Sequence, residues 1–182
     1  MNPAILECGQ RISIVGTSGS GKTTLARQIS QHLAIPHVEL DALYHEPNWT
    51  EAPTDVFRKR VQQALSGYSW VVDGNYSKVR DIVWSQADTV VWLDYSLPVA
   101  MRRLLRRTLR RVVMQEELWN GNRETWQMML SRDSIILWAL TTYRKHRNNY
   151  PILLSQLEYA HLKVVHLRSP KTTQAWLKNL TV

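Results

Sequence analysis

The stretch Gly16-Thr17-Ser18-Gly19-Ser20-Gly21-Lys22-Thr23 decides the fold of this chain. It fits the pattern G-x-x-x-x-G-K-[ST] in full, the Walker A signature of a phosphate-binding loop (P-loop). A strand-like run at residues 11–15 precedes it, and an amphipathic helical stretch at residues 23–33 follows it. Such loops sit in this strand–loop–helix setting. The alternative is an ordinary Gly/Ser turn before a helix.

The residue types of the loop suit a nucleotide. Its glycines allow positive φ angles, so that successive amide N–H groups point at phosphate oxygens near the positive end of a helix dipole. Lys22 would reach the β- and γ-phosphates, and the Thr23 hydroxyl would ligate Mg²⁺. We therefore expect ATP and Mg²⁺ as cofactors, with Lys22 also catalytic. The expected nucleotide-binding residues of the loop are Gly16, Thr17, Ser18, Gly19, Ser20, Gly21, Lys22, Thr23 and Thr24.

Strand-like and helical stretches alternate on both sides of this loop. The strand-like runs are rich in β-branched or aromatic residues and nearly continuously apolar, which is typical of parallel strands covered on both faces. They lie at residues 11–15, 36–40, 69–72, 89–93 and 162–167, and helical stretches lie at 23–33, 55–65 and 171–180. Thr54 is expected to cap the second helix, and Ser169 with Pro170 to open the third. The alternation predicts a doubly wound α/β domain.

Residues 98–148 interrupt the alternation. They contain two long helical stretches, about 98–114 and 123–146, separated by Asn120-Gly121-Asn122. We interpret this region as a helical lid inserted into one domain that spans residues 1–182. In its second helix, the apolar residues are expected to form a core face; they are Trp126, Met129, Leu130, Leu137 and Leu140.

The first lid helix carries six arginines on one half of its helical wheel and mostly apolar residues on the other. The arginines are Arg102, Arg103, Arg106, Arg107, Arg110 and Arg111. Like charges in one row repel each other, and the forked guanidinium suits phosphate oxygens. We expect catalytic arginines that close over the transferring phosphates, with Arg103, Arg106, Arg107 and Arg110 as the candidates. A solvated face paired with acids elsewhere and a face that binds a nucleic-acid backbone are the alternatives.

Three aspartates follow strand-like runs, where parallel sheets place their ligands. Asp73 is expected to bind Mg²⁺, unless it only caps the following turn. Asp41 is expected to orient an acceptor hydroxyl and accept its proton, with turn capping as the alternative. For Asp94, capping of the helix near Pro98 is the favoured interpretation.

Composition limits the class of protein. The 182 residues are 44% apolar and 21% charged, which is typical of a globular chain. Cys8 is the only cysteine, so no disulfide forms within the chain and a Cys-rich zinc site is excluded. The first residues lack the pattern of a signal peptide, and no apolar run is long enough to span a bilayer. We expect a cytoplasmic protein without a membrane partner.

Charge is unevenly distributed along the chain. The net charge is +8, and residues 100–150 hold eleven basic and four acidic residues. A localised basic surface favours an anionic partner. Phosphate groups on a small molecule and a nucleic-acid backbone both fit this composition.

These motifs resemble the adenylate-kinase-related P-loop kinases, and most closely the branch labelled DNA topology modulation proteins. The resemblance rests on the P-loop, residues 40–44 with Trp49, Asp73-Gly74-Asn75-Tyr76-Ser77, residues 90–94 and residues 167–170. It implies a P-loop NTPase fold with three α/β/α layers, a five-stranded parallel sheet in the order 2-3-1-4-5 and a mobile lid. It also implies Asp73 near Mg²⁺, lid arginines over the phosphates, and Arg168, Ser169 and Pro170 beside the adenine.

The chain departs from adenylate kinases after Asp73. Those enzymes carry D-G-F-P-R where this chain has Asp73-Gly74-Asn75-Tyr76-Ser77, so the acceptor-binding arginine is missing and Arg80 is the candidate substitute. The sequence as a whole predicts an ATP- and Mg²⁺-dependent small-molecule kinase with a nucleoside or nucleotide acceptor. The alternative is a nucleotide-regulated nucleic-acid-binding protein that uses the arginine helix.

Overall fold

The computed structural model describes residues 6–7, 9–131 and 134–181. Cys8, Arg132 and Asp133 lie outside the described residues, as does most of the segment to which the signal-peptide expectation applies. Within the described part of the chain, no helix is long and apolar enough to cross a bilayer.

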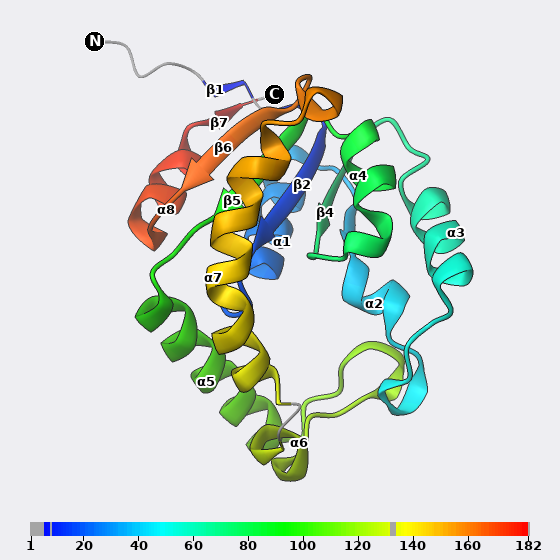
Figure 1. Cartoon of the computed structure of the whole chain (residues 1–182), viewed down its shortest axis with the longest axis vertical. Coiled ribbons are helices and arrows are strands. Elements are labelled where there is room, and N and C mark those ends of the chain that lie inside the picture. Colours follow the sequence, from blue (N-terminus) through cyan, green and yellow to red (C-terminus); the bar gives the residue numbers. More distant parts are fainter. Residues whose placement is uncertain (1–5, 8, 132–133, 182) are drawn as a thin grey trace.

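A parallel sheet forms the centre of the molecule (Figure 1). Among the described residues its strands are β2 (Arg11–Gly16), β3 (His37–Glu39), β4 (Trp70–Asp73), β5 (Thr89–Leu93) and β6 (Lys163–Leu167). They pair in the order β3-β4-β2-β5-β6, which confirms the predicted order 2-3-1-4-5 for these five strands. Because Ile14 pairs with Asp73, the P-loop leaves the sheet at the edge where Asp73 lies. A separate short parallel pair joins β1 (Leu6–Glu7) and β7 (Leu180–Thr181).

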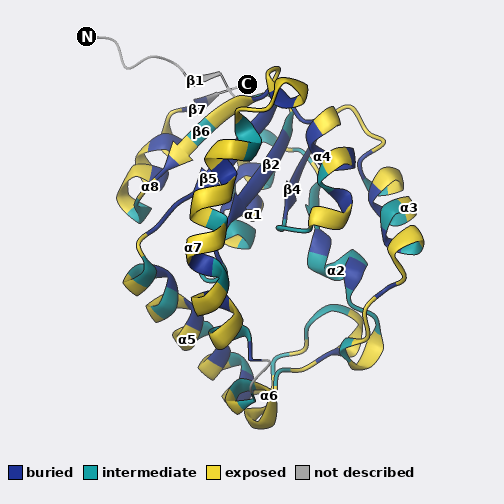
Figure 2. Cartoon of the chain, in the orientation of Figure 1, coloured by how far each residue is buried: buried dark blue, intermediate teal, exposed yellow. Residues whose placement is uncertain are grey.

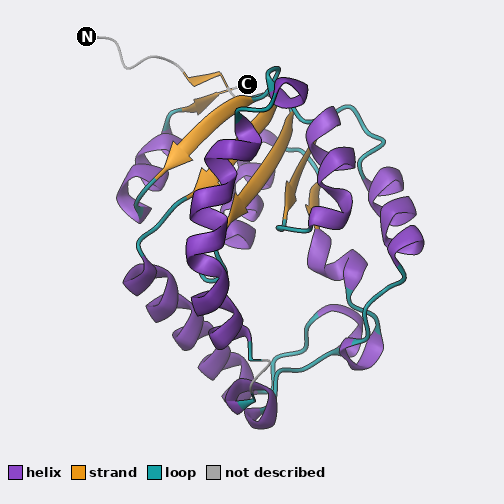
Figure 3. Cartoon of the chain, in the orientation of Figure 1, coloured by secondary structure: helices purple, strands orange, loops and turns teal. Residues whose placement is uncertain are grey.

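Helices cover both faces of the sheet and explain the continuous apolar strands (Figure 3). α1 (Lys22–Leu33) and α8 (Pro170–Lys178) pack on one face, around Ile14, Ile29 and Trp176. The other face holds α3 (Thr54–Ala64), α4 (Arg80–Gln86) and a buried cluster that includes Phe57 and Trp84. Successive residues of β4 contribute to opposite clusters, since side chains alternate along a strand. The short helix α2 (Leu40–Tyr44) follows β3 directly.

The region expected to be a lid contains one of its two predicted long helices. α5 (Leu97–Met114) is present, but the prediction of a continuous helix at 123–146 is wrong. The structure has a short α6 (Trp126–Leu130) and then a long α7 (Ile135–Leu154). Thr125 and Ser134 cap the two helices by accepting hydrogen bonds from Met128 and Leu137 N–H groups, so the helices start separately.

The predicted core face of this region is also wrong. Leu130 is 78% exposed, and Trp126, Leu137 and Leu140 are between 42% and 48% exposed. On α5, Leu105 and Leu109 are exposed as well, so its buried stripe is narrower than its apolar half. Figure 2 shows the cause: α5, α6 and the first half of α7 extend beyond the sheet and meet few covering elements.

Two predicted helix starts have different outcomes. Ser169 caps α8 as predicted, in a reciprocal arrangement with Thr172. The expectation that Thr54 caps α3 is wrong, because the helix begins one residue earlier than predicted. Pro53 holds the cap position with an extended backbone, and Thr54 lies in the first turn.

Candidate active site

A single cleft of about 830 Å³ brings most of the predicted site residues together. Its size is within the usual range for small-molecule sites, roughly 300–1,000 Å³. The predicted residues that line it are Ser18, Gly19, Ser20, Gly21, Lys22, Thr23, Thr24, Asp41, Asp73, Arg103, Arg106, Arg107, Arg110 and Pro170. Gly16 and Thr17 start the same loop. The described lining includes Pro170 but neither Arg168, which is exposed, nor Ser169, which caps α8.

The P-loop needs its glycines because α5 packs directly on it. Gly19 has a φ of 82°, and a Cβ there would lie 2.3 Å from the Ala100 carbonyl oxygen and 2.9 Å from the Leu104 Cβ. Gly21 adopts the left-handed conformation that opens α1. A side chain at Gly19 would therefore separate the loop from α5 and widen the cleft.

The Lys22 ammonium is buried against its own loop. Its Nζ donates to the carbonyl oxygens of Gly16 at 2.8 Å and Thr17 at 3.3 Å. Burial lowers the pKa of Lys22, and the Asp73 and Asp41 carboxylates oppose that shift. The cation thus lies at the base of the cleft within the field of both acids.

Asp73 ends β4 and is buried, with two side-chain partners among the described residues. Its Oδ1 accepts from the Thr23 hydroxyl at 3.0 Å, and its Oδ2 lies 2.7 Å from His37 Nε2. Asp73 therefore faces the start of α1. A hydroxyl and a carboxylate side by side are oxygen donors of the kind that Mg²⁺ prefers, completed by waters and phosphates. No cluster of three or more His, Cys, Asp or Glu suited to a metal occurs in the described residues.

Asp41 lies in the first turn of α2, on the other side of the cleft floor. Its Oδ1 accepts a hydrogen bond of 2.6 Å from the Tyr76 hydroxyl. Burial, followed by the charge of Asp41, raises the pKa of Tyr76, so this phenol stays protonated and donates. Arg80 does not share the cleft: it lies over the Trp84 ring and lines a separate small cavity of about 20 Å³.

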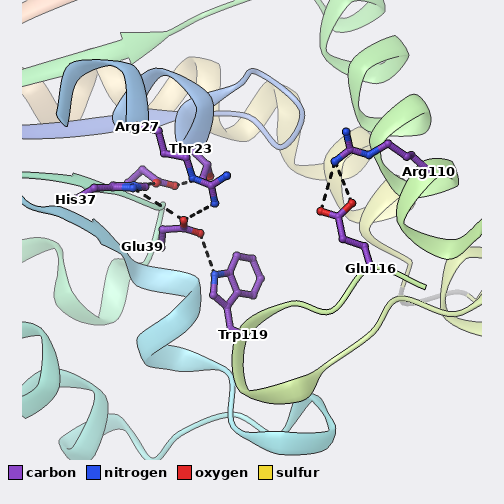
Figure 4. Close-up of polar contacts among 8 residues, drawn as sticks. Thr23, Arg27, His37, Glu39, Arg110, Glu116 and Trp119 are labelled. Carbon is purple, nitrogen blue, oxygen red and sulfur yellow. Dashed lines mark hydrogen bonds and ion pairs between the residues drawn. The ribbon is translucent and has the colours of Figure 1, made fainter. Parts of the chain in front are cut away.

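The arginines of α5 face the P-loop with different partners. Arg103 donates to the Ser20 carbonyl at 3.2 Å, and Arg106 lines the cleft. Arg110 pairs with Glu116 at 2.9 Å (Figure 4), and Arg111 pairs with Glu124 at 2.8 Å. Pairing with acids, the alternative interpretation of this row, thus occurs at two of its arginines.

Arg107 differs from its neighbours. Burial, and then the charge of Arg111, lowers the pKa of the Arg107 guanidinium. Its Nε, like that of Arg111, is buried and has no hydrogen-bond partner within the described part of the chain. Arg111 has an ion pair with Glu124, whereas Arg107 has none among these residues. A buried unpaired donor is costly, so this position is suited to an anion that enters the cleft.

Sequence reasoning missed the residue that holds the start of the P-loop. Asn75 Oδ1 accepts from Gly16 N–H at 3.2 Å, while Asn75 Nδ2 donates to the Gly16 carbonyl at 2.6 Å. Tyr150 on α7 donates to the same Asn75 Oδ1 at 3.0 Å. The signal was present, because Asn75 stands where the chain departs from the adenylate-kinase pattern.

Two further assignments from sequence need correction or addition. Asp94 does not cap α5, whose cap position is Ser96; it pairs with His166 at 3.0 Å and Arg147 at 3.3 Å. Glu39 was not predicted, yet it lines the cleft and binds Arg27 at 2.7 Å and Trp119 Nε1 at 2.9 Å (Figure 4).

Comparison with known proteins agrees with this geometry. A family model described as an AAA domain matches residues 12–127. The chain belongs to this AAA domain family. The match covers the P-loop, β3 to β5 and the arginine helix of the family member. The finer placement in the DNA topology modulation branch stays a prediction.

Curated relatives of this family member are kinases. The shikimate kinase of Synechococcus elongatus is 28% identical over 111 residues, which cover 53% of this chain and 58% of that protein. The chain therefore spans less than two thirds of that relative. The cytidylate kinase of Pyrobaculum aerophilum is 30% identical over 130 residues, covering 59% of this chain and 69% of that one.

Solved structures share the fold over nearly the whole chain. A gluconokinase from Sinorhizobium meliloti 1021 has a TM-score of 0.53 at 19% identity and covers 94% of this chain and 88% of its own. The shikimate kinase from Acinetobacter baumannii in complex with shikimate has a TM-score of 0.54 at 16% identity, with coverages of 93% and 92%. These similarities show that this chain has the fold of P-loop kinases.

Proposed function

We propose that the protein is an ATP- and Mg²⁺-dependent small-molecule kinase that phosphorylates a hydroxyl group, with a nucleoside or nucleotide as acceptor. One observation carries the proposal: the cleft that holds Lys22 and Asp73 also holds Asp41. A nucleotide-binding loop and a carboxylate for an acceptor thus share one space. The kinase relatives support the same class of reaction.

The nucleotide side of the cleft uses the loop and the start of α1. The loop amides and Lys22 would bind the β- and γ-phosphates, and the turn of Arg168, Ser169 and Pro170 would approach the adenine through Pro170, its member in the cleft lining. Thr23 and Asp73 would hold Mg²⁺, which supplies charge neutralisation on the phosphates when bound. The fit is supported by the 3.0 Å contact of the Thr23 hydroxyl with Asp73 Oδ1.

The acceptor side uses Asp41. Its carboxylate orients the acceptor hydroxyl and takes its proton, while the acceptor oxygen bonds to the γ-phosphorus. The bond from that phosphorus to the β,γ-bridging oxygen breaks, and ADP leaves. Residues 98–148 act as a lid, and Arg103, Arg106, Arg107 and Arg110 stabilise the transferring phosphoryl group. Arg107 is the strongest candidate because its buried Nε is unpartnered among the described residues.

A nucleotide-regulated nucleic-acid-binding protein receives less support. Five arginines of α5 line the cleft, and two of them, Arg110 and Arg111, already pair with acids. A backbone-binding surface would instead leave its cations free of acidic partners, and its affinity would fall steeply with salt.

The test is ATP consumption by the full chain with Mg²⁺ against nucleosides, nucleoside monophosphates and other small alcohols. We expect ADP release that depends on one class of acceptor, slow hydrolysis without it, and loss of turnover in Lys22→Ala. Acceptor-independent ATP use in wild type, or turnover that survives Lys22→Ala, would contradict the proposal.

A further inference from the structure

An indole forms part of the wall of the cleft near Asp41. Residues 117–123 form a hairpin joined by a bridge between Glu117 and Arg123. Trp119 lies in this hairpin and lines the same cleft as Asp41. Figure 4 shows its ring beside Glu39, with Arg110 and Glu116 across the open side.

The orientation of this indole is fixed from several sides. Nε1 donates to Glu39 Oε2 at 2.9 Å, and the His45 ring stacks against the indole with a centroid distance of 6.3 Å and an interplanar angle of 19°. A ring that is already ordered binds a flat ligand without a large loss of side-chain entropy.

The hairpin is also tied to the segment that carries Asp41. Asn120 Nδ2 donates to the His45 carbonyl at 2.5 Å, and Asn122 Nδ2 donates to the Glu46 carbonyl at 2.9 Å. The backbone N–H of Trp49 donates to Asn122 Oδ1 at 2.8 Å. The positions of the indole and of Asp41 are therefore coupled through residues 39–49.

The charges at this wall favour an acceptor without an anionic group. The guanidinium of Arg27 is engaged by Glu39, and that of Arg110 by Glu116. Asp41 contributes a negative charge whose hydrogen-bond donor is the neutral Tyr76 phenol. A phosphate or carboxylate placed between Trp119 and Asp41 would be repelled by Glu39 and Asp41. The cations whose charges act on Asp41, Lys22 and Arg107, are assigned to the transferring phosphates by the proposed function.

Resting on the proposed function, we propose that Trp119 determines acceptor specificity by stacking on the ring of an uncharged hydroxyl compound, a nucleoside or a sugar. Sugar and base faces both pack well on aromatic rings, and this contact tolerates different ring types. With its ring against the indole, the acceptor presents a hydroxyl to Asp41. This assigns an uncharged ring compound, a nucleoside or a sugar, in preference to its anionic counterpart, as the acceptor class.

The test is equilibrium binding by calorimetry to the full chain saturated with Mg²⁺ and a non-hydrolysable ATP analogue. The probes are matched pairs: cytidine with CMP, adenosine with AMP, uridine with UMP and glucose with gluconate. We expect the neutral member of at least one pair to bind more tightly than its anionic partner. Trp119→Ala should weaken that binding about tenfold or more, and Trp119→Phe should keep it within about threefold.

A matched control separates the ring from a general effect of tryptophan loss. Trp138 is 43% exposed on α7 and does not line the cleft, so Trp138→Ala should leave binding unchanged. The inference is overturned if no neutral probe binds, if the anionic member binds more tightly in every pair, or if Trp119→Ala binds like wild type. It is also overturned if Trp119→Phe binds the neutral probe as weakly as Trp119→Ala does. Trp119 would then act through its hydrogen bond to Glu39 and not through its ring.

Failure of the proposed function gives a different result. If wild type does not consume ATP, the kinase proposal fails. Binding of the neutral probes without the ATP analogue would still show whether their affinity depends on the ring of Trp119. The two proposals therefore have separate readouts.

Discussion

The cleft has two walls that differ in the source of their hydrogen-bond donors: mainly backbone groups in the P-loop wall and side chains in the α5 wall. The P-loop wall consists of backbone amides and Lys22. It is held by contacts from Asp73, at the end of neighbouring β4, and from Asn75, which follows that strand. The α5 wall consists of long arginine side chains, two of which pair with acids, Glu116 and Glu124. A backbone wall is rigid and preformed, whereas a side-chain wall can exchange partners when an anion arrives.

This difference assigns separate roles to the two walls: the P-loop binds the nucleotide, and the α5 arginines rearrange when the cleft closes over it. The P-loop supplies fixed donors that need no rearrangement. On α5, Arg107 lacks a partner for its buried Nε among the described residues, while Arg110 would have to exchange Glu116 for phosphate. Changes in the P-loop wall should therefore have larger effects on nucleotide binding than single changes on α5.

The largest effect is expected at the P-loop wall. Lys22→Ala should lower ATP turnover by about a hundredfold or more, because it removes the cation that contacts the phosphates. The fold should persist, since the partners of Lys22 Nζ among the described residues are carbonyls of its own loop. Steady-state ADP release and thermal unfolding measure the two quantities. Lys59→Ala, at an exposed position of α3, is the matched control, and equal turnover in both variants would contradict the account.

Asp73→Asn should come next, with turnover lowered about ten- to a hundredfold and a higher Mg²⁺ requirement. Asparagine keeps the size of the side chain and an oxygen acceptor but loses the charge that attracts the metal. A Mg²⁺ titration of turnover checks this, with exposed Asp55→Asn as control. Unfolding of Asp73→Asn at the assay temperature would show that the contacts to Thr23 and His37 are structural.

On the α5 wall, Arg107→Ala should lower turnover about tenfold and leave the melting temperature unchanged or higher, because an unpaired buried cation is lost. Arg107→Lys should rescue only partly, since lysine lacks the forked donors. Arg102→Ala is the control, because Arg102 is exposed and outside the cleft lining. Equal turnover in Arg107→Ala and Arg102→Ala would show that Arg107 does not take part in the reaction.

The smallest effect sharpens the comparison. Asn75→Ala should weaken binding of an ATP analogue about three- to tenfold, because two hydrogen bonds to Gly16 are lost. Tyr150→Phe, which removes one bond to Asn75, should stay within about threefold. Calorimetry measures both affinities. Wild-type affinity in Asn75→Ala would mean that the loop holds its shape without this contact.

The parts that the sequence predicted well depend on local pattern. The P-loop is a contiguous motif, and the apolar strands follow from strand–helix alternation, whereas their order was implied by the resemblance to adenylate-kinase-related P-loop kinases. The division of the predicted helix into α6 and α7 was missed because single caps, Thr125 and Ser134, outweigh a continuous helical pattern. The exposure of Leu130 and Leu137 could not be predicted, since it depends on whether another element covers α6 and α7.

The parts of the site that were missed depend on distant segments meeting. Asn75 and Gly16 are 59 positions apart, and Trp119 and Glu39 are 80 apart. Their contacts exist only because β4 lies beside β2 and the 117–123 hairpin reaches the segment after β3. Asp41 and Asp73 could be placed at one edge because parallel strands end together.

Hydrogen exchange of the full chain, with and without Mg²⁺ and a non-hydrolysable ATP analogue, tests the central claim most directly. If the cleft binds nucleotide phosphates between its two walls, amides of residues 16–24 should gain the most protection. Residues 97–124 should gain less, and Lys22→Ala should abolish both changes. Identical exchange with and without the analogue in both segments would contradict the account.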